Sequence, residues 1–220
     1  LIRWNSKKYG FTGPNTFIPL LEDSALIIPL GRWIINTAAK ACNRWITSIP
    51  DFVMHINLSF VQIVKSNIVK DVLENIERYS AANNHYVFEI TETIEMDQIP
   101  AVQNVFKEFV KNDFRFAIDD FGTGYSNYGY MRDRTFDIVK VDRSFVTDID
   151  KLKDNYLMVS FIIKMAHEMG LHVCIEGVET KEELSCVKRL GADYIQGYYY
   201  GKPVCLQDFE EQHLKRFVLG

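Results

Sequence analysis

Short apolar runs rich in strand-forming residues alternate with longer helical patterns along this chain of 220 residues, and no other feature constrains its fold as strongly. Several of the runs are nearly continuous, as expected of strands that are covered on both faces of a parallel sheet. Repeated right-handed β-α units build either an open doubly wound sheet or a closed barrel of eight strands. The alternation therefore predicts an α/β protein. We expect strands at Leu1–Trp4, Val53–Ser59, Tyr86–Thr91, Arg115–Phe121, Asp137–Asp142, His172–Gly177 and Tyr194–Tyr199.

Helical periodicity fills the segments between these runs. A turn at Pro19–Ser24 is expected to open a long helix over 23–46. Thr180, with Glu183 three residues later, forms a capping box at the start of a helix that ends near Gly191. No linker or low-complexity stretch divides the chain, so we expect residues 1–220 to form a single domain. Further helices are predicted at Asn67–Ala81, Ala101–Val110 and Asn155–Met169.

Composition excludes several classes of protein. The formal net charge of −4 gives no overall basic bias, so we expect no DNA or RNA duplex as a partner. The four cysteines lack the C-x-x-C spacing of a zinc site, and three of them lie in apolar stretches, as expected of reduced thiols in a cytoplasmic protein. No apolar run approaches the length of a membrane span.

Acids, amides and a lysine fall at the carboxyl ends of six consecutive predicted strands. In a closed parallel barrel these ends converge on one face, where the active sites of that fold lie. Carboxylates crowded into a cleft repel one another unless they are protonated or share cations. Oxygen ligands without histidine favour Mg²⁺ or Mn²⁺. The residues are Asn57, Glu89 with Glu92, Asp119 with Asp120, Lys140 with Asp142, Glu176 with Glu179, and Gln196.

This pattern indicates phosphate-ester hydrolysis. The adjacent Asp119 and Asp120 suit the bridging of two ions that activate water and clamp a phosphate, and Lys140 offers a fixed positive charge. Each residue taken alone has a structural explanation: Lys140 could extend its charge to the surface, and Glu176 and Glu179 could be acids at a helix start. All of these explanations must hold together for the functional interpretation to fail.

Eight stretches, in order along the chain, resemble the EAL family of cyclic di-GMP phosphodiesterases. Any one of them is a weak signal, but the ordered set covers nearly the whole chain. The stretches are Leu1–Trp4, Phe17–Leu20 with Leu30–Trp33, Asn57–Ser59 with Gln62, Glu89–Glu92, Asp119–Ser126, Lys140–Asp142, Glu176–Thr180, and Gln196–Tyr198 with Lys202–Pro203.

The resemblance implies a modified TIM (β/α)8 barrel with one reversed strand, which hydrolyses cyclic di-GMP to linear pGpG with two Mg²⁺ or Mn²⁺ ions and is inhibited by Ca²⁺. It assigns Asn57, Glu89 and Asp119 to one ion, and Asp119, Asp120 and Glu176 to the second. Together with Asp119 and Glu176, Lys140 is an expected catalytic residue, which places the attacking water.

The resemblance also implies contacts outside the metal centre. Glu92 is expected to hold the loop after Asp120, and the Phe121–Asn127 region to form a homodimer contact. The expected substrate contacts and their supports are Arg3, Asp142, Glu179, Gln196 and Pro203.

The signature glutamate of the family, which would lie two residues before Leu1, is not in this sequence. Either the domain is truncated at its N-terminus, together with its first strand, or a metal ligand is absent. We expect truncation, with sensory or GGDEF-type domains in the same polypeptide and a membrane anchor upstream as a further option. Two other functions stay open: a catalytically inactive EAL domain that acts as a cyclic di-GMP receptor or interaction module, and a barrel enzyme acting on another phosphate ester.

Overall fold

The structure, a computed structural model, describes residues 2–91, 100–123 and 135–214. The chain divides into two compact units. The first unit comprises residues 1–88, 101–114 and 203–220, and the second comprises residues 89–100 and 115–202. That residues 1–220 form a single domain stays a prediction.

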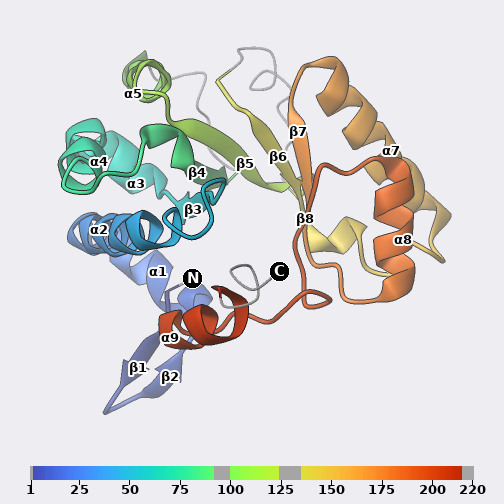
Figure 1. The fold of residues 1–220 in the computed structure, drawn as a ribbon, viewed down its shortest axis with the longest axis horizontal. Helices are drawn as coiled ribbons and strands as arrows, with labels where there is room; N and C mark the ends of the chain where they lie inside the picture. Colours follow the sequence, from blue (N-terminus) through green and yellow to red (C-terminus); the bar gives the residue numbers. More distant parts are fainter. Residues whose placement is uncertain (1, 92–99, 124–134, 215–220) are drawn as a thin grey trace. The chain divides into compact units, whose positions relative to one another are not determined.

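Six strands, β3 to β8, form one sheet in which each strand neighbours the next one along the chain (Figure 1). This sequential order fits the barrel, one of the two arrangements that the alternation of strands and helices allows, and β4 and β5 have the predicted bounds. The strands are β3 (Met54–Asn57), β4 (Tyr86–Thr91), β5 (Arg115–Phe121), β6 (Ile138–Val141), β7 (His172–Ile175) and β8 (Tyr194–Ile195).

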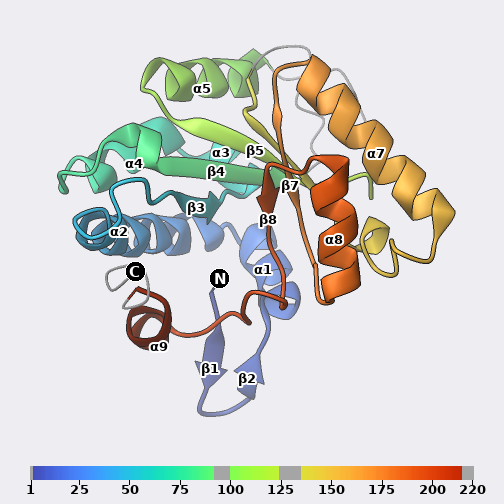
Figure 2. The same cartoon turned by 45° about the vertical axis from the view of Figure 1, so that its right-hand side comes forward.

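In the second unit, β5 to β8 are parallel, and β6 pairs with β7 from Ile138↔His172 to Val141↔Ile175. Helices α7 (Lys153–Glu168) and α8 (Lys181–Leu190) lie side by side against this part of the sheet (Figures 1 and 2). The cores of β6 and β7 are almost inaccessible to solvent, with Val139 and Val173 both 0% exposed. Because β5 to β8 are parallel, their carboxyl ends lie at one edge of the sheet.

The first unit is mainly helical. Its longest helix, α2 (Ile27–Trp45), packs against α4 (Ile68–Ile76), and Arg32 forms an ion pair with the largely buried Asp71 at 2.9 Å. The ring of Trp45 packs at a tilt against Phe209, with 4.8 Å between ring centres. The remaining α-helices described in the structure are α1 (Pro14–Asp23), α3 (Phe60–Lys65), α5 (Pro100–Lys111) and α9 (Leu206–Phe209).

Two predictions for the N-terminal part of the chain are wrong. The segment predicted as a first barrel strand, Leu1–Trp4, instead leads into β1 (Trp4–Ser6), which pairs antiparallel with β2 (Gly10–Thr12) as a separate two-stranded sheet. Gly10 adopts a φ of 71°, which lets the chain fold back on itself within a few residues. The turn predicted at Pro19–Ser24 lies largely inside α1 (Pro14–Asp23), and the helix predicted over 23–46 begins later, as α2 (Ile27–Trp45), after a break at Ala25, whose φ is 57°.

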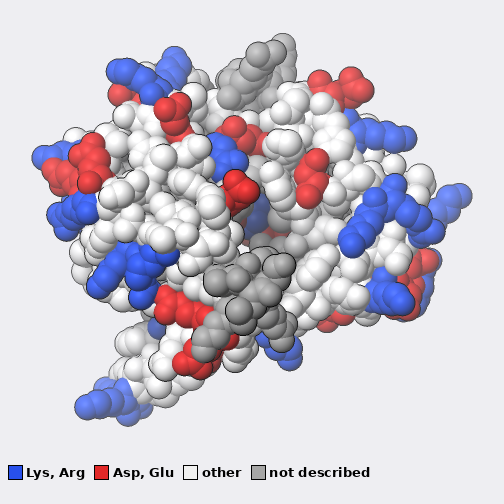
Figure 3. Space-filling model, viewed as in Figure 1, with Lys and Arg blue, Asp and Glu red and all other residues white. Residues whose placement is uncertain are grey.

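Charged side chains of both signs are mixed over the face seen in Figure 3, in keeping with the small net charge. Among the described residues, no helix is long and apolar enough to cross a membrane. Cys42, Cys174 and Cys186 are buried free thiols, as predicted for cysteines in apolar stretches, and Cys205 is exposed.

Candidate functional site

Lys140 lies at the centre of a buried ionic cluster in the second unit. It stands on β6 and is 3% exposed. Its Nζ lies 2.8 Å from Glu89 Oε1, 2.9 Å from Asp119 Oδ1 and 2.7 Å from Glu176 Oε1. One ammonium group therefore faces three carboxylates, and the cluster carries excess negative charge in a place with little water. Such charges are costly unless they find further partners.

The sheet register places these groups together. Because Val141 pairs with Ile175, Glu176 follows directly after β7 beside the end of β6, and its N–H donates to Val141 O at 3.1 Å. The pairing of β5 with β6 shifts between Ile118 and Phe121, across the Asp119-Asp120 pair. Irregularities of this kind re-aim side chains at strand ends.

Asp120 sits in this irregular stretch with a φ of 54°, a conformation that non-glycine residues rarely adopt. Asp119, Asp120 and Glu176 each offer a carboxylate oxygen within 4.8 Å of the others. Three hard oxygen donors at this spacing fit Mg²⁺ or Mn²⁺ better than zinc or copper.

Burial and mutual repulsion shift the pKa values of the cluster. Burial raises the pKa of Glu176 although Lys140 opposes the shift, and burial with the charges of Asp119 and Asp142 raises the pKa of Asp120. Burial alone would lower the pKa of Lys140, but Glu89, Asp119 and Glu176 outweigh it and raise that pKa. The lysine therefore stays charged, while Glu176 and Asp120 lose their protons less readily than usual, and a divalent cation would offset that cost.

Other predicted site residues of the second unit lie in the segments that follow these strands. Asp142 accepts a hydrogen bond from Ser144 N at 2.9 Å, so its carboxylate caps the short helix over 143–145. Glu179 forms an ion pair with Arg143 at 3.1 Å. The backbone of Gln196 donates to Ile175 O at 2.8 Å and accepts from Val178 N at 3.2 Å. Gln196 is thereby tied to the loop that carries Glu179.

Arg143 is a neighbour of the cluster that sequence reasoning missed. Besides pairing with Glu179, it packs on Gly177, where an added Cβ would lie 2.5 Å from Arg143 Cγ. Gly177 also has a φ of 73°. Gly177, which follows Glu176, was the one signal in the sequence that another segment of the same chain passes close to this loop.

Three predicted site residues belong to the first unit. Asn57 ends β3, and Arg3, just before the β1–β2 hairpin, is exposed and bonds to Ile2 O at 2.8 Å. Pro203 is exposed as well. Their metal and substrate roles stay predictions. Glu92 lies outside the described residues, as does the 124–127 part of the predicted dimer region.

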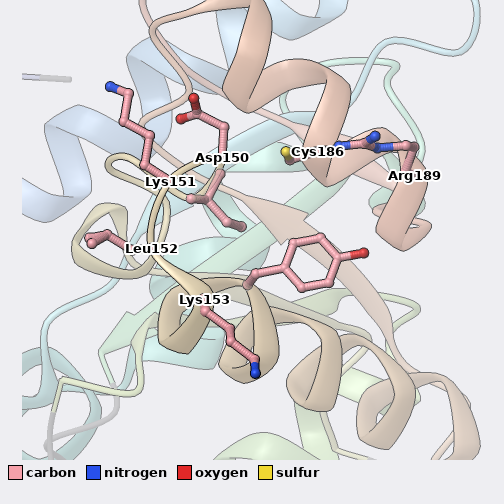
Figure 4. A pocket seen from close by; sticks show the side chains of 8 residues that line it. Asp150, Lys151, Leu152, Lys153, Cys186 and Arg189 are labelled. Carbon is pink, nitrogen blue, oxygen red and sulfur yellow. Dashed lines mark hydrogen bonds between the residues drawn. The ribbon is translucent and has the colours of Figure 1, made fainter.

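A pocket of about 410 Å³ opens elsewhere in the second unit (Figure 4). It is bordered by residues 149–153, by Tyr156 at the start of α7, and by Cys186 and Arg189 of α8. None of the predicted site residues lines it.

Comparison with known proteins gives consistent matches over nearly the whole chain. The model of the EAL domain family matches residues 1–203. The chain is 32% identical over 209 residues to the probable cyclic di-GMP phosphodiesterase PdeG of Escherichia coli K12, covering 94% of this chain and 41% of PdeG. It is 30% identical over 205 residues to the bifunctional diguanylate cyclase/cyclic di-GMP phosphodiesterase MucR of Pseudomonas aeruginosa, covering 93% of this chain and 30% of MucR. The chain thus spans less than half the length of each of these two relatives.

A solved structure confirms the predicted fold class. The EAL enzyme Bd1971, in a form with cAMP and cyclic di-GMP bound, superposes with a TM-score of 0.90 at 35% identity, over 98% of this chain and 58% of that one. The α/β fold of the EAL type is the modified TIM barrel that the sequence motifs implied.

Proposed function

The chain belongs to the EAL domain family, and on this premise we propose that it is a metal-dependent phosphodiesterase that hydrolyses cyclic di-GMP to linear pGpG. The observation that carries the proposal is the buried contact of Lys140 with Glu89, Asp119 and Glu176. A cluster of this kind is unfavourable for folding stability alone, which favours a chemical role. The names of PdeG and MucR point to the same substrate.

Asp119, Asp120 and Glu176 are the described residues that fit a divalent cation, Mg²⁺ or Mn²⁺. Glu89 and, from the first unit, Asn57 complete the proposed ligand set for two ions. Ions bound there would polarise phosphate oxygens and lower the pKa of a bound water. Ca²⁺, which is larger and more tolerant in its coordination geometry, is proposed to bind without supporting turnover.

The residues of the chain then have distinct tasks. Lys140, whose raised pKa keeps it charged, orients the attacking water and fixes the carboxylates of Glu89 and Glu176. We assign contacts with the substrate or its surrounding polar groups to Arg3, Asp142, Glu179, Gln196 and Pro203, and support of the loop after Asp120 to Glu92.

The decisive experiment measures pGpG release from cyclic di-GMP by the full-length protein, with Mg²⁺ and with a chelator. We expect turnover with Mg²⁺ and none after chelation. Asp119→Asn should lower kcat by about 100-fold or more, since charge stabilisation in the transition state is lost. The matched control is Asp154→Asn, which removes an exposed carboxylate from the first turn of α7 and should leave turnover unchanged.

Three results would contradict the proposal. Normal turnover by Asp119→Asn would remove this residue from the mechanism. Tight binding of cyclic di-GMP without pGpG release in Mg²⁺ would instead make the chain a receptor or interaction module. Failure to bind cyclic di-GMP at all would favour a different phosphate ester as substrate.

The remaining expectations concern the intact protein. We propose a cytoplasmic catalytic domain, sensory or GGDEF-type domains in the same polypeptide, and a homodimer that uses the Phe121–Asn127 region. Sedimentation velocity tests the dimer, and an active protein that sediments only as a monomer would contradict it.

A further inference from the structure

Glu183 makes an unusually large number of contacts for a carboxylate outside the candidate site. It lies in the first turn of α8 and is 6% exposed. Its Oε2 accepts hydrogen bonds from Glu179 N at 2.8 Å and Thr180 N at 3.0 Å, and its Oε1 accepts one from Asp148 N at 3.2 Å. Capping of α8 explains the bond to Thr180 N, but capping alone does not explain the bond to Asp148.

These bonds join two connections that carry predicted site residues. Glu179 and Thr180 close the β7–α8 loop, which begins at Glu176. Asp148 belongs to the β6–α7 connection, which begins at Asp142 and lies beside α8 (Figure 2). The buried side chain of Glu183 therefore ties the loop that follows Glu176, a proposed metal ligand, to the connection that follows Lys140.

The bond from Glu183 reaches a strained point of the β6–α7 connection. Asp148 has a φ of 55°, which is unfavourable for a residue other than glycine and persists only where surrounding contacts hold it. The N–H groups of Val146 and Thr147 both bond to Arg143 O, so the turn that ends at Asp148 starts at Arg143. A bond that fixes Asp148 therefore also restrains Arg143, the partner of Glu179.

The charge of Glu183 is maintained by the same contacts. Burial by itself would raise its pKa, but the N–H groups of Glu179, Thr180 and Asp148 together with the Thr180 hydroxyl outweigh burial and lower that pKa. Glu183 therefore accepts these bonds as a full carboxylate, and bonds to a charged acceptor are stronger than neutral ones.

We propose that Glu183 is a positioning residue for the phosphodiesterase site: its carboxylate holds the β7–α8 loop against the β6–α7 connection and thereby fixes the Arg143–Glu179 pair, which joins the two. This inference rests on the proposed function. It assigns to the capping glutamate of α8 an effect on divalent-ion binding and turnover, in addition to its effect on the helix.

Two substitutions test the proposal: one removes all the hydrogen bonds of the Glu183 carboxylate, and the other removes only the bond to Asp148. Glu183→Ala removes both acceptor oxygens, and with them all three bonds, and should lower kcat by about 10-fold or more, because displacements near 1 Å at a reacting centre have effects of this size. It should also raise the Mg²⁺ concentration needed for half-maximal turnover.

Glu183→Gln separates the two connections. A carboxamide has one oxygen, which can still serve Glu179 N and Thr180 N, but its NH₂ group then faces Asp148 N. Amide hydrogen exchange should therefore accelerate at Asp148 and change little at Thr180. Turnover should fall less than in Glu183→Ala.

Two controls separate positioning from helix capping and from charge. Thr180→Ala removes the hydroxyl that accepts from Glu183 N at 3.2 Å but leaves the bond to Asp148 in place. Glu182→Ala removes an exposed carboxylate from the same helical turn. Both variants should keep the Mg²⁺ dependence of the wild type.

The outcomes distinguish this proposal from the proposed function. If the wild type does not hydrolyse cyclic di-GMP, amide exchange at Asp148 and calorimetric titration with Mg²⁺ alone still compare Glu183→Gln with the wild type. Unchanged exchange and unchanged Mg²⁺ affinity in that variant would overturn the proposal. So would a Thr180→Ala variant with the same kinetic losses as Glu183→Ala, since capping would then account for them.

Discussion

In the second unit, carboxylates at the carboxyl ends of the strands and carboxylates at the amino ends have opposite surroundings and opposite pKa shifts. At the carboxyl ends, Glu176 is crowded with other acids around Lys140, and burial raises its pKa. At the amino ends, Asp193 accepts hydrogen bonds from Val173 N at 2.7 Å and from His167 Nε2 at 2.8 Å. Burial alone would raise the pKa of Asp193, but Val173 N–H and the two nearby histidines outweigh it and lower that pKa.

Asp137, at the amino end of β6, resembles Asp193. Its Oδ2 accepts from Phe116 N at 3.0 Å, and its backbone oxygen accepts from His172 N at 2.9 Å. Acids at the amino ends thus bond to the backbone of a neighbouring strand, whereas acids at the carboxyl ends repel one another. The comparison teaches that carboxylates stabilise the fold at the amino-end edge of the sheet. At the carboxyl-end edge, keeping them ionised costs folding free energy.

The largest expected effect comes from Glu176→Gln. Turnover of cyclic di-GMP should fall by about 1,000-fold, because the charge of a proposed metal ligand is lost. The variant should nevertheless be as stable as the wild type or more stable at pH 7. A carboxyl group whose pKa is raised on folding makes its ionised form unfavourable, and this penalty grows as the pH rises above the ordinary value of 4.5.

Thermal unfolding without divalent ions measures the stability part of this prediction, and pGpG release measures turnover. A Tm more than a few degrees below that of the wild type would show that ionised Glu176 stabilises the fold. The contrast between the two edges would then be lost.

Asp193→Ala should have the opposite profile. We expect a loss of about 1–3 kcal/mol in the free energy of unfolding at pH 7, since the buried Val173 N–H loses its acceptor. Turnover should stay within about twofold of the wild type, because an acid at the opposite strand ends does not touch the site. Urea unfolding and pGpG release measure the two quantities.

The pH dependence sharpens this second prediction. Because the pKa of Asp193 is lowered on folding, its contribution is present above the ordinary value of 3.8 and is lost as the pH falls through the folded value. The stability difference between wild type and Asp193→Ala should therefore shrink below that pH. A difference that stays constant down to pH 2 would assign the effect to packing instead of charge.

His167→Ala should have the smallest effect. The side chain of His167 is 41% exposed, so its pairing with Asp193 is screened by water, and we expect a loss below about 1 kcal/mol. Urea unfolding at low and high salt measures it. If this loss matched that of Asp193→Ala, the histidine and not the backbone N–H would be the main partner of Asp193.

Much of the fold was predictable because each strand and helix start is marked by a short pattern of neighbouring residues. The apolar runs of β4 and β5 gave correct bounds, and the Thr180–Glu183 capping box correctly located the start of α8. The N-terminal segment was predicted wrongly, because Leu1–Trp4 has the composition of a strand and nothing in that composition specifies its partner. The hairpin formed there depends on the turn at Gly10 and on Trp4 packing against Phe17, with 5.9 Å between ring centres.

For the site, the sequence by itself determined which groups stand at strand ends, because a parallel strand order brings Glu89, Asp119, Lys140 and Glu176 to one edge whatever the details of packing. Only the tertiary structure decided how these groups share charge, with one lysine among three carboxylates. It also decided that Glu183 reaches Asp148, which lies 35 residues away along the chain. Hydrogen bonds and pKa values depend on distances of a few ångströms, and those are set by the packing of whole elements against one another.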